Sequence, residues 1–376
     1  MRLRVLAVAA LLVVVVGASA AVRSGTRGAA SVERAPVVTA DRGALDAARS
    51  FLDRYLDADG RVVRHDQGAD TVSEGQAYAM LIAAAVDDRP RFERAWRWTR
   101  VHLQRPDGLL SFLWRDGRVE DPQPASDADL DAARALLLAA DRFGVDRYRR
   151  DGLRLATGIV QRETASSDAG LLLLAGPWAD YGSRLVVNPS YFAPRTYAVL
   201  AKATRDGRWR RLAASSRAVV SDLQSGGTLL PPNWAIVGDD SGIRASGPPS
   251  DEGEAPKYGF DAARLPLRYA ESCDARDRRS AAAVWRVLKV RGIDELSTRH
   301  DLDGERDESG VHPVGLVGAA AAASAAGDAR TSTLLLARAD ELDRRSPTYY
   351  GAALVALGRL ALTTDRLGSC PTGPRG

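Results

Sequence analysis

The sequence contains little lysine and no basic block. Its 376 residues include 52 Lys and Arg against 48 Asp and Glu, which gives a net charge of only +4. Lysine occurs only as Lys202, Lys257 and Lys289, and the arginines are spread along the chain among aspartates. Proteins that bind nucleic acids gather their basic residues into a patch or stripe. The sequence therefore predicts no nucleic-acid partner.

Cysteine and histidine are also scarce, and the sequence contains no motif typical of a metal site or a redox site. The two cysteines, Cys273 and Cys370, form no C-x-x-C pair, and the four histidines are scattered. This spacing supports neither a zinc nor a redox site, and we expect no metal and no cofactor. In an exported protein the two cysteines either form a disulfide that holds the C-terminal tail or remain thiols. Sequence supplies no distance that would decide between these two states.

Long apolar runs are absent except at the N-terminus. Two arginines precede the apolar residues 5–16, and Ala18-Ser19-Ala20 offers a cleavage site with small side chains. This layout is typical of a signal peptide, which we assign to residues 1–20. The alternative is an uncleaved membrane anchor, since the apolar stretch approaches spanning length. Both readings place the body outside the cytoplasm, and cleavage predicts a secreted chain with no stable membrane contact.

The remainder reads as one predominantly helical domain. Residues 21–40 are small, polar and aperiodic, which predicts a disordered spacer. Residues 41–365 form the predicted domain and 366–376 a C-terminal tail. Ala-rich and Leu-rich segments with helical periodicity recur between Gly, Pro and Asp. The predicted helices span 43–57, 73–87, 89–104, 127–143, 145–161, 193–204, 207–224, 260–272, 275–291, 314–326, 330–344 and 348–363.

Twelve helices in about six pairs indicate an all-α fold, a closed ring of helical hairpins. An α-solenoid would show a fixed repeat length, and none is found. Strand signals are weak, the best being residues 60–64 and 183–188. Residues 225–258, rich in Gly, Pro and Asp, predict a long connection inside the domain, and loops of that length are often functional.

The stretch "TVSEGQAYAM", residues 71–80, has the signature of a helix start. Ser73 is placed to cap the helix, and Gln76 follows three residues later, as in a capping box. Glu74 then lies in the first turn, where the helix dipole favours an acid. These local roles account for Glu74 completely, but they do not exclude a chemical role.

Two further stretches place acids at helix starts. In "PASDADLDAARALLLAADRF", residues 124–143, capping by Ser126 and the helix dipole account for Asp127, Asp129 and Asp131. In "KYGFDAARLPLRYAES", residues 257–272, Asp261 opens a helix and Arg264 follows one turn later. Taken alone, that spacing predicts an ion pair that contributes little stability at a surface.

Taken together, four motifs resemble glycoside hydrolase family eight. They are "TVSEGQAYAMLIA", "ASDADLDAARALLLA", "NPSYFAP" and "YGFDAARLPLR", and the resemblance runs from about Asp41 to Leu362. The sequence departs from the family at Ala132, where Ile or Met is usual. It also departs at Ala263 and Leu267, where Cys and Trp are expected. Because these are packing positions, the departures touch the chemistry little, although a lost Trp could alter the cleft wall.

The resemblance implies an (α/α)6 barrel and a secreted, inverting endo-β-1,4-glucanase (cellulase). Glu74 matches the general acid of the family and Asp261 matches the general base. Asp127 matches the acid that holds the sugar at the cleavage point. The resemblance also implies four other substrate-binding residues. Tyr191 matches an active-centre tyrosine, Arg264 an arginine beside the base, and Trp114 an aromatic platform for the sugar. Either Tyr349 or Tyr350 should line the cleft, and we select Tyr350.

Inverting hydrolysis explains why two carboxyl groups are needed. One protonates the leaving oxygen and the other deprotonates a water, with the two groups roughly 6.5–9.5 Å apart. A helix start favours ionised Glu74, yet a general acid must hold its proton. Burial or the neighbouring Asp127 would raise the pKa of Glu74. Asp261 needs the opposite environment, and Arg264 could keep it ionised.

Alternatives remain for the substrate, the base and the class of protein. The acidic segment 238–254 would suit chitosan, and it contains Asp251 and Glu252 as rivals to Asp261. A carbohydrate-binding or cell-envelope protein without activity is the alternative of another class. Trp114, Trp178 and Trp234 have loop-like surroundings and are candidate sugar platforms, whereas the four tryptophans in helical runs are predicted to pack. We expect a monomer that acts on a β-1,4-linked polysaccharide.

Overall fold

The structure, a computed structural model, describes residues 37–225, 230–238, 242–251, 253–307 and 310–370. The predicted signal peptide and most of the predicted spacer lie outside these residues, as does the end of the predicted tail. The first helix, α1, covers Val37–Tyr55 and so begins within the last four residues of the predicted spacer.

The described residues contain twelve α-helices, as the periodicity predicts. Within a few residues, most of their bounds match those read from the sequence. After α1 they are α2 Ser73–Ala85, α3 Arg89–His102, α4 Ser126–Phe143, α5 Asp146–Arg162, α6 Pro194–Thr204, α7 Arg208–Ser225, α8 Leu265–Ala270, α9 Ala275–Leu288, α10 Pro313–Ala325, α11 Ala329–Arg345 and α12 Tyr349–Thr363.

Apolar composition decides which helices form the inner layer. In α2 every residue except Glu74 is buried, and α10 is buried from Pro313 to Ala323. Helix α3 instead buries one stripe, formed by Phe92, Ala95, Trp96, Trp98 and Thr99. A helix that is apolar on all sides belongs inside a fold, whereas an amphipathic helix covers its surface.

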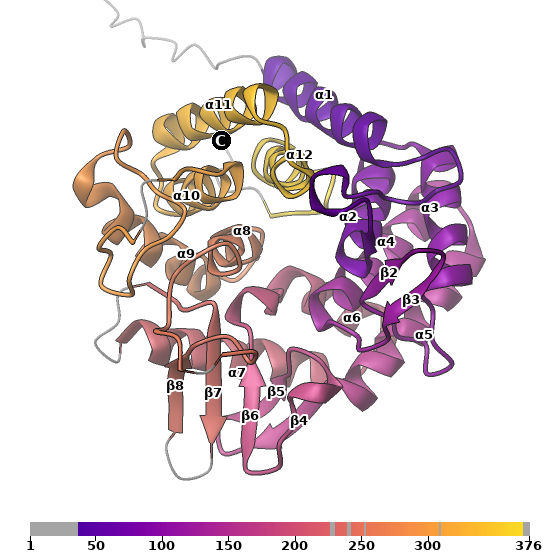
Figure 1. The fold of residues 1–376 in the computed structure, drawn as a ribbon, viewed down its shortest axis with the longest axis horizontal. Coiled ribbons are helices and arrows are strands. Elements are labelled where there is room, and N and C mark those ends of the chain that lie inside the picture. The colour runs from indigo at the N-terminus through magenta and orange to yellow at the C-terminus, as the bar shows by residue number, and fades with distance from the viewer. Residues whose placement is uncertain (1–36, 226–229, 239–241, 252, 308–309, 371–376) are drawn as a thin grey trace, which may run out of the picture. The chain divides into compact units, whose positions relative to one another are not determined.

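The inner helices close into a ring. Contacts run in order from α2 to α4, α6, α8, α10 and α12, and α12 contacts α2 again. Figure 1 shows the same succession around the centre, with odd-numbered helices such as α3, α5 and α11 outside it. The helices therefore form an (α/α)6 barrel, and the prediction of an all-α barrel is confirmed.

The described residues also form eight short strands, arranged in three antiparallel sheets. The sheets are β1 Thr71–Val72 with β2 Leu113–Arg115 and β3 Arg118–Asp121, then β4 Thr164–Ser167 with β5 Gly170–Leu173, and finally β6 Arg184–Val187 with β7 Trp234–Gly238 and β8 Gly242–Ser246. Strand β6 lies within the segment 183–188 that the sequence favours. Residues 60–64 form only isolated bridges. The connection predicted at 225–258 contains β7 and β8, so it is not a plain loop.

The helix predicted at 260–272 is shorter than expected. A single 3-10 turn, Ala262–Arg264, precedes α8, which begins at Leu265. Pro266 lies in the first turn of α8, where a missing N–H costs nothing. Asp261 immediately precedes the 3-10 turn, so its side chain lies at an irregular joint near the end of the long connection rather than inside a helix.

The C-terminal segment is joined covalently to the barrel. Cys273 and Cys370 form a disulfide with a Cα–Cα distance of 5.1 Å, which answers the question that the sequence left open. The backbone N–H of Cys370 also donates to the carbonyl of Glu271 at 3.3 Å. None of the described helices has the length and apolarity needed to cross a bilayer.

Candidate active site

The first turn of α2 brings Glu74 to one end of the barrel. Glu74 is the only residue of α2 that is not buried. The predicted capping box is wrong, because Val72 occupies the cap position and Ser73 makes no capping bond. The Gln76 side chain is fully buried and instead accepts the Val62 N–H and donates to Thr99 Oγ1 at 2.8 Å. Gln76 therefore anchors α2 to its surroundings.

Arg264 joins three acidic side chains from distant parts of the sequence. Its Nη1 donates to Asp127 Oδ2 at 2.7 Å and to Glu74 Oε2 at 2.9 Å. Its Nη2 donates to Asp261 Oδ1 at 2.9 Å. The two carboxylates predicted to be catalytic and the one predicted to hold the sugar thus meet at one guanidinium group. Since Arg264 was expected only beside Asp261, the structure gives it a more central position.

Polar and aromatic groups complete the surroundings of Arg264. Ser190 Oγ accepts from Nη2 at 3.1 Å, and Tyr78 Oη lies 3.3 Å from Nη1. The ring centroid of Tyr191 is 5.2 Å from the guanidinium carbon, a cation–π geometry. Arg264 itself is only 2% exposed. A buried cation with this many partners is fixed in place, and the carboxylates that it contacts are fixed with it.

The three carboxylates differ in access to solvent. The Glu74 and Asp261 side chains are 20% and 32% exposed, whereas Asp127 is 3% exposed. Glu74 and Asp261 can therefore reach a sugar or a water, while Asp127 lies deeper. Glu74 and Asp261 bond to different terminal nitrogens of one guanidinium group, so their carboxyl groups lie near each other.

The local environment makes Glu74 a carboxyl group that titrates near neutrality. Removal from bulk water raises its pKa to about 7, Arg264 opposes that rise, and Asp127 and Asp261 add to it. A hydrogen bond from Tyr349 also opposes the rise. The predicted rise in the pKa of Glu74 is therefore confirmed, with burial as the main cause and Asp127 as a contributor.

The pKa of Asp261 shifts in the direction opposite to the one predicted from the sequence. Burial raises its pKa above the ordinary aspartate value, although Arg264 acts in the opposite sense. The nearby charge of Asp127 raises it further. The sequence suggested that the charge of Arg264 would keep Asp261 ionised. In the structure, Asp261 shares this guanidinium group with two other carboxylates.

Two adjacent tyrosines at the start of α12 make different contacts. Tyr349 Oη donates to Glu74 Oε1 at 3.2 Å, whereas Tyr350 Oη donates to the carbonyl of Phe260 at 3.2 Å. The selected residue, Tyr350, thus lies beside Asp261, and Tyr349 contacts the candidate acid directly. Gly75 makes room for this contact, because a Cβ there would lie 2.8 Å from Tyr349 Oη.

One candidate platform tryptophan, Trp234, lies beside Tyr191, and a second, Trp178, lies beside Trp234. The rings of Trp234 and Tyr191 meet edge to face with centroids 6.2 Å apart, and Trp178 lies 6.4 Å from Trp234. Trp114 lies in β2, paired with Thr71 just before α2. The guanidinium of Arg61 covers one face of the Trp114 ring at 4.4 Å. A sugar would therefore have to use the other face of that ring.

A small pocket adjoins the candidate base. Its volume is about 190 Å³, and its lining includes Trp234, Phe260 and Asp261. Asp251, the rival base, is exposed and accepts the N–H of Gly253 in a surface turn. Glu252, the other rival, lies outside the described residues. Asp261 is thus the described acid of this region that contacts Arg264.

A second layer of ion pairs supports the site from behind. The Arg268 guanidinium donates to both oxygens of Asp131 at 2.5 Å, and both side chains are buried. The Oδ1 of Asp129 accepts the Leu110 N–H at 3.0 Å. Ser126 donates its hydroxyl to the carbonyl of Leu174 and caps nothing, since Ala125 occupies the cap position. The acids at the start of α4 therefore mainly form contacts with residues outside this helix and do not cap it.

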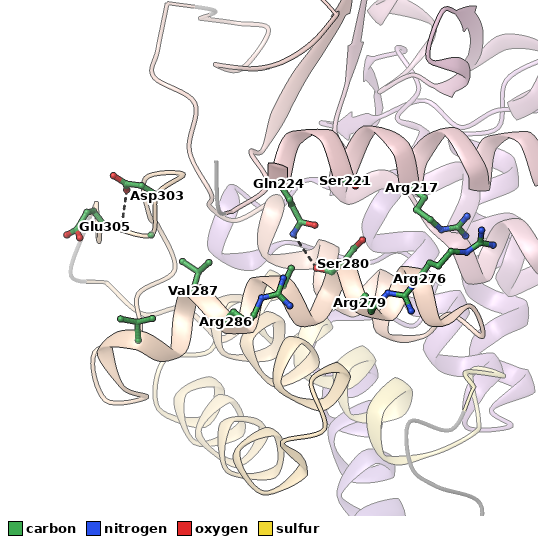
Figure 2. A pocket seen from close by; sticks show the side chains of 13 residues that line it. Arg217, Ser221, Gln224, Arg276, Arg279, Ser280, Arg286, Val287, Asp303 and Glu305 are labelled. Atoms are coloured by element: carbon green, nitrogen blue, oxygen red, sulfur yellow. Dashed lines mark hydrogen bonds between the residues drawn. The ribbon is translucent and has the colours of Figure 1, made fainter. Parts of the chain in front are cut away.

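A larger pocket of about 810 Å³ lies elsewhere, between α7, α9 and the loop around Asp303. Figure 2 shows Arg217, Arg276 and Arg279 at one end of it, and Asp303 and Glu305 near the other. Arg217 is already engaged with Asp277 and Asp274. None of the carboxylates that contact Arg264 lines this pocket, so it is not the candidate active site. Among the described residues, no group of three or more His, Cys, Asp or Glu is placed to hold a metal ion.

Comparison with known proteins agrees with this geometry. The family described as glycosyl hydrolases family 8 matches residues 37–364. A "Probable endoglucanase" of Novacetimonas hansenii is 32% identical over 227 residues, which cover 58% of this chain and 64% of that protein. An "Endoglucanase" of Cellulomonas uda is 29% identical over 221 residues, which cover 57% of this chain and 60% of that protein. The match thus spans less than two thirds of either curated relative.

A solved structure extends the similarity over most of the chain. The endo-β-1,4-glucanase CMCax from Acetobacter xylinum superposes with a TM-score of 0.72 at 27% sequence identity. The superposition covers 85% of this chain and 97% of that one. The predicted family resemblance is therefore confirmed.

Proposed function

Since the chain belongs to glycosyl hydrolases family 8, we propose that it is an endo-β-1,4-glucanase that cleaves internal glucan bonds by inversion. The observation that carries this proposal is the meeting of Glu74, Asp127 and Asp261 at Arg264. The endoglucanase names of the relatives support a β-glucan as substrate.

Glu74 is the general acid in this proposal. With a pKa of about 7 it is mostly protonated below that pH and can pass its proton to the leaving oxygen. Its partial exposure leaves the carboxyl accessible to a bound sugar. Tyr349 fixes the orientation of the carboxyl group through Oε1, while Arg264 contacts Oε2.

Asp261 is the general base that activates water. It is the more exposed of the two carboxylates, which suits a group that must receive water from solvent. Burial raises the pKa of Asp261, and its contact with Arg264 opposes that rise and so favours the ionised form that a base requires. Asp127, Tyr191, Trp114 and Tyr350 are assigned to sugar binding, with Asp127 at the cleavage point.

The remaining assignments concern location and assembly. We propose that residues 1–20 direct export and are removed, that the mature chain is secreted, and that it acts as a monomer. Chitosan hydrolysis on the same carboxylates and sugar binding without hydrolysis are the two competing functions.

The test is reducing-end release from carboxymethyl cellulose, mixed-linkage glucan, xylan and chitosan by the mature chain and by Glu74→Gln and Asp261→Asn. We expect cleavage of the glucans, and a loss on the order of 10² or more in each variant. Cleavage of chitosan alone would overturn the substrate, and binding without cleavage would favour the non-catalytic protein. The anomer formed first, read by NMR, tests inversion, because a retaining enzyme releases the opposite anomer.

A further inference from the structure

Two buried acids behind the active site have no role in the chemistry proposed above. Asp129 lies in the first turn of α4, two residues after Asp127, and Glu163 directly follows the end of α5. Both side chains are 0% exposed. Charged groups that are removed from water in this way require partners.

Three of the four carboxyl oxygens of this pair have no hydrogen-bond donor among the described residues. Asp129 Oδ1 accepts the Leu110 N–H, but no nitrogen or hydroxyl among the described residues reaches Asp129 Oδ2 or either oxygen of Glu163. Helices α4 and α5 pack against each other, and the pKa of each of these two carboxyl groups is shifted by a side-chain hydrogen bond with the other. Two ionised carboxylates cannot hydrogen-bond, so the contact requires a proton on one of them.

The surrounding charges favour retention of that proton. Burial raises the pKa of both groups well above the usual carboxyl range. The negative charges of Asp127 and Asp107 act on both in the same direction. Arg105, which is itself paired with Asp107, interacts electrostatically with both acids, and their charges raise its pKa. Among the described residues no cation bonds directly to Asp129 or Glu163, so a second negative charge on the pair would be uncompensated.

The backbone of Glu163 also takes part in bonds that lead to the start of α4. The backbone carbonyl of Glu163 accepts the Leu174 N–H at 2.9 Å. The carbonyl of Leu174 in turn accepts the Ser126 hydroxyl at 2.6 Å. Ser126, Asp127 and Asp129 belong to one helical turn, so this set of bonds determines where the Asp127 carboxylate lies.

We propose that Asp129 and Glu163 share a single proton and act as a positioning pair, which holds the first turn of α4 so that Asp127 meets Arg264. Neither residue touches the reacting atoms. The side chains of Asp127 and Asp129 point in different directions, because residues two apart on a helix do not share a face. Asp127 faces the active site while Asp129 faces α5. The catalytic part of this inference rests on the proposed glucanase function.

The decisive comparison is Glu163→Gln against Glu163→Ala. Glutamine keeps the shape of a protonated glutamate and can donate its amide hydrogen to Asp129 Oδ2. We expect Glu163→Ala to lower kcat by roughly tenfold or more, because small displacements of a positioned group are costly. Glu163→Gln should recover most of that loss. Asp129→Asn, which still accepts from Leu110 and can donate to Glu163, should behave like Glu163→Gln.

Two further measurements separate a shared proton from ordinary packing. The infrared difference spectrum between the wild type and Glu163→Gln should contain a protonated-carboxyl band at a pH well above the ordinary carboxyl range, because the contribution of Glu74 is common to both proteins and cancels. The wild type should also lose stability relative to Glu163→Gln as pH rises from the ordinary carboxyl pKa toward the raised one. This loss reaches up to about tenfold per pH unit in the unfolding equilibrium constant, the slope of one extra proton bound by the native state.

Leu155→Ala serves as the packing control, because Leu155 is fully buried in α5 and makes no polar contact with the pair. It should lower stability but leave both the infrared band and the kcat of the folded fraction unchanged. If Glu163→Gln loses as much activity as Glu163→Ala, or if the difference spectrum lacks the band, the positioning pair is wrong. If the wild type cleaves no glucan, the proposed function fails, while the band and the stability slope still test the shared proton.

Discussion

At the residue scale, the site depends on one cation shared among three acids. Arg264 is buried and uses both terminal nitrogens for carboxylates. If all three acids were ionised, the group would carry an excess of two negative charges. Protonation of Glu74 halves that excess, which adds to burial as a physical reason why the pKa of this acid is raised to about 7.

Replacing Arg264 by lysine should therefore damage the site even though the charge is kept. A single ammonium group cannot reproduce the planar fork that contacts three carboxylates. We expect Arg264→Lys to lower kcat on the order of 10²-fold, because the carboxylates lose their fixed geometry. Steady-state kinetics on mixed-linkage glucan would measure this.

Arg217→Lys is the matched control. Arg217 also bonds to two aspartates, at 3.0 and 2.7 Å, but it lies at the pocket between α7 and α9. This control should keep kcat near the wild-type value. Equal losses in the two variants would mean that Arg264 acts through general stability.

The pH dependence of kcat/KM should place Glu74 on the alkaline limb. Its pKa is about 7, and a general acid must be protonated, so activity should fall as pH rises through about 7. The hydrogen bond from Tyr349 lowers the pKa of Glu74. Tyr349→Phe should therefore move the alkaline limb to higher pH. A limb that stays in place or moves to lower pH would contradict the assignment of this limb to Glu74.

Which residues the sequence could identify at this scale depends on their spacing. Tyr78 follows Glu74 by four residues on α2, so helical geometry alone would have placed it on the same face. Asp261 and Arg264 were found from their motif. The choice between Tyr349 and Tyr350 was open, because which neighbour faces the barrel depends on where α12 begins. The Asp129–Glu163 contact joins two helices, and no local pattern predicts it.

At the element scale, helices were easier to predict than strands. Helix α4 repeats its apolar face over eighteen residues, and this signal stands on its own. Strands β7 and β8 have five residues each, and β7 pairs with β6, which lies about fifty residues earlier in the chain. A strand of that length is stabilised by its neighbours, which the local sequence does not reveal. The connection 225–258 therefore resembled a loop.

This sheet carries Trp234 to the site, so β7 has a predicted effect on substrate binding. Trp234 lies edge to face with Tyr191 and lines the pocket beside Asp261. Trp234→Ala should raise KM by roughly tenfold, the order expected for loss of one aromatic contact. The effect on kcat should be smaller. Substrate titration of the folded variant would measure both.

Tyr181→Ala provides the comparison at the neighbouring strand. Tyr181 is 51% exposed and donates its backbone N–H to the carbonyl of Arg184 in β6. Removal of an exposed aromatic ring there should leave KM unchanged. A similar rise in KM for both variants would indicate a general disturbance of the sheet, and Trp234 would then have no specific role in sugar binding.

At the scale of the whole domain, ring closure positions residues from four regions of the sequence. Glu74, Asp127, Asp261 and Tyr349 come from the starts of α2 and α4, the joint before α8 and the start of α12. The inner helices begin at the same end of the barrel, so a small number of residues at their starts meet there. Helix count and apolar pattern were sufficient to predict the ring. The distances within the site required the packed structure.

A disulfide also joins the C-terminal segment to the closed ring. Its removal should lower stability and leave catalysis unchanged. The Cys273–Cys370 disulfide joins residues 97 apart, and a loop of that length corresponds to about 4–5 kcal/mol in the chain-entropy treatment. The tail keeps other attachments, since Arg134 donates to the Leu367 carbonyl at 2.8 Å. We therefore expect Cys370→Ser to lower the free energy of unfolding by about 2–4 kcal/mol.

The loss should be read from denaturant unfolding, with kcat measured well below the melting temperature. Cys273→Ser and the double variant should lose the same amount as Cys370→Ser, because all three remove one and the same bond. A reducing agent should lower the stability of the wild type and leave the variants unchanged. Additive losses in the double variant would show that each cysteine contributes by packing, and a fall in kcat would show that the disulfide also shapes the active site.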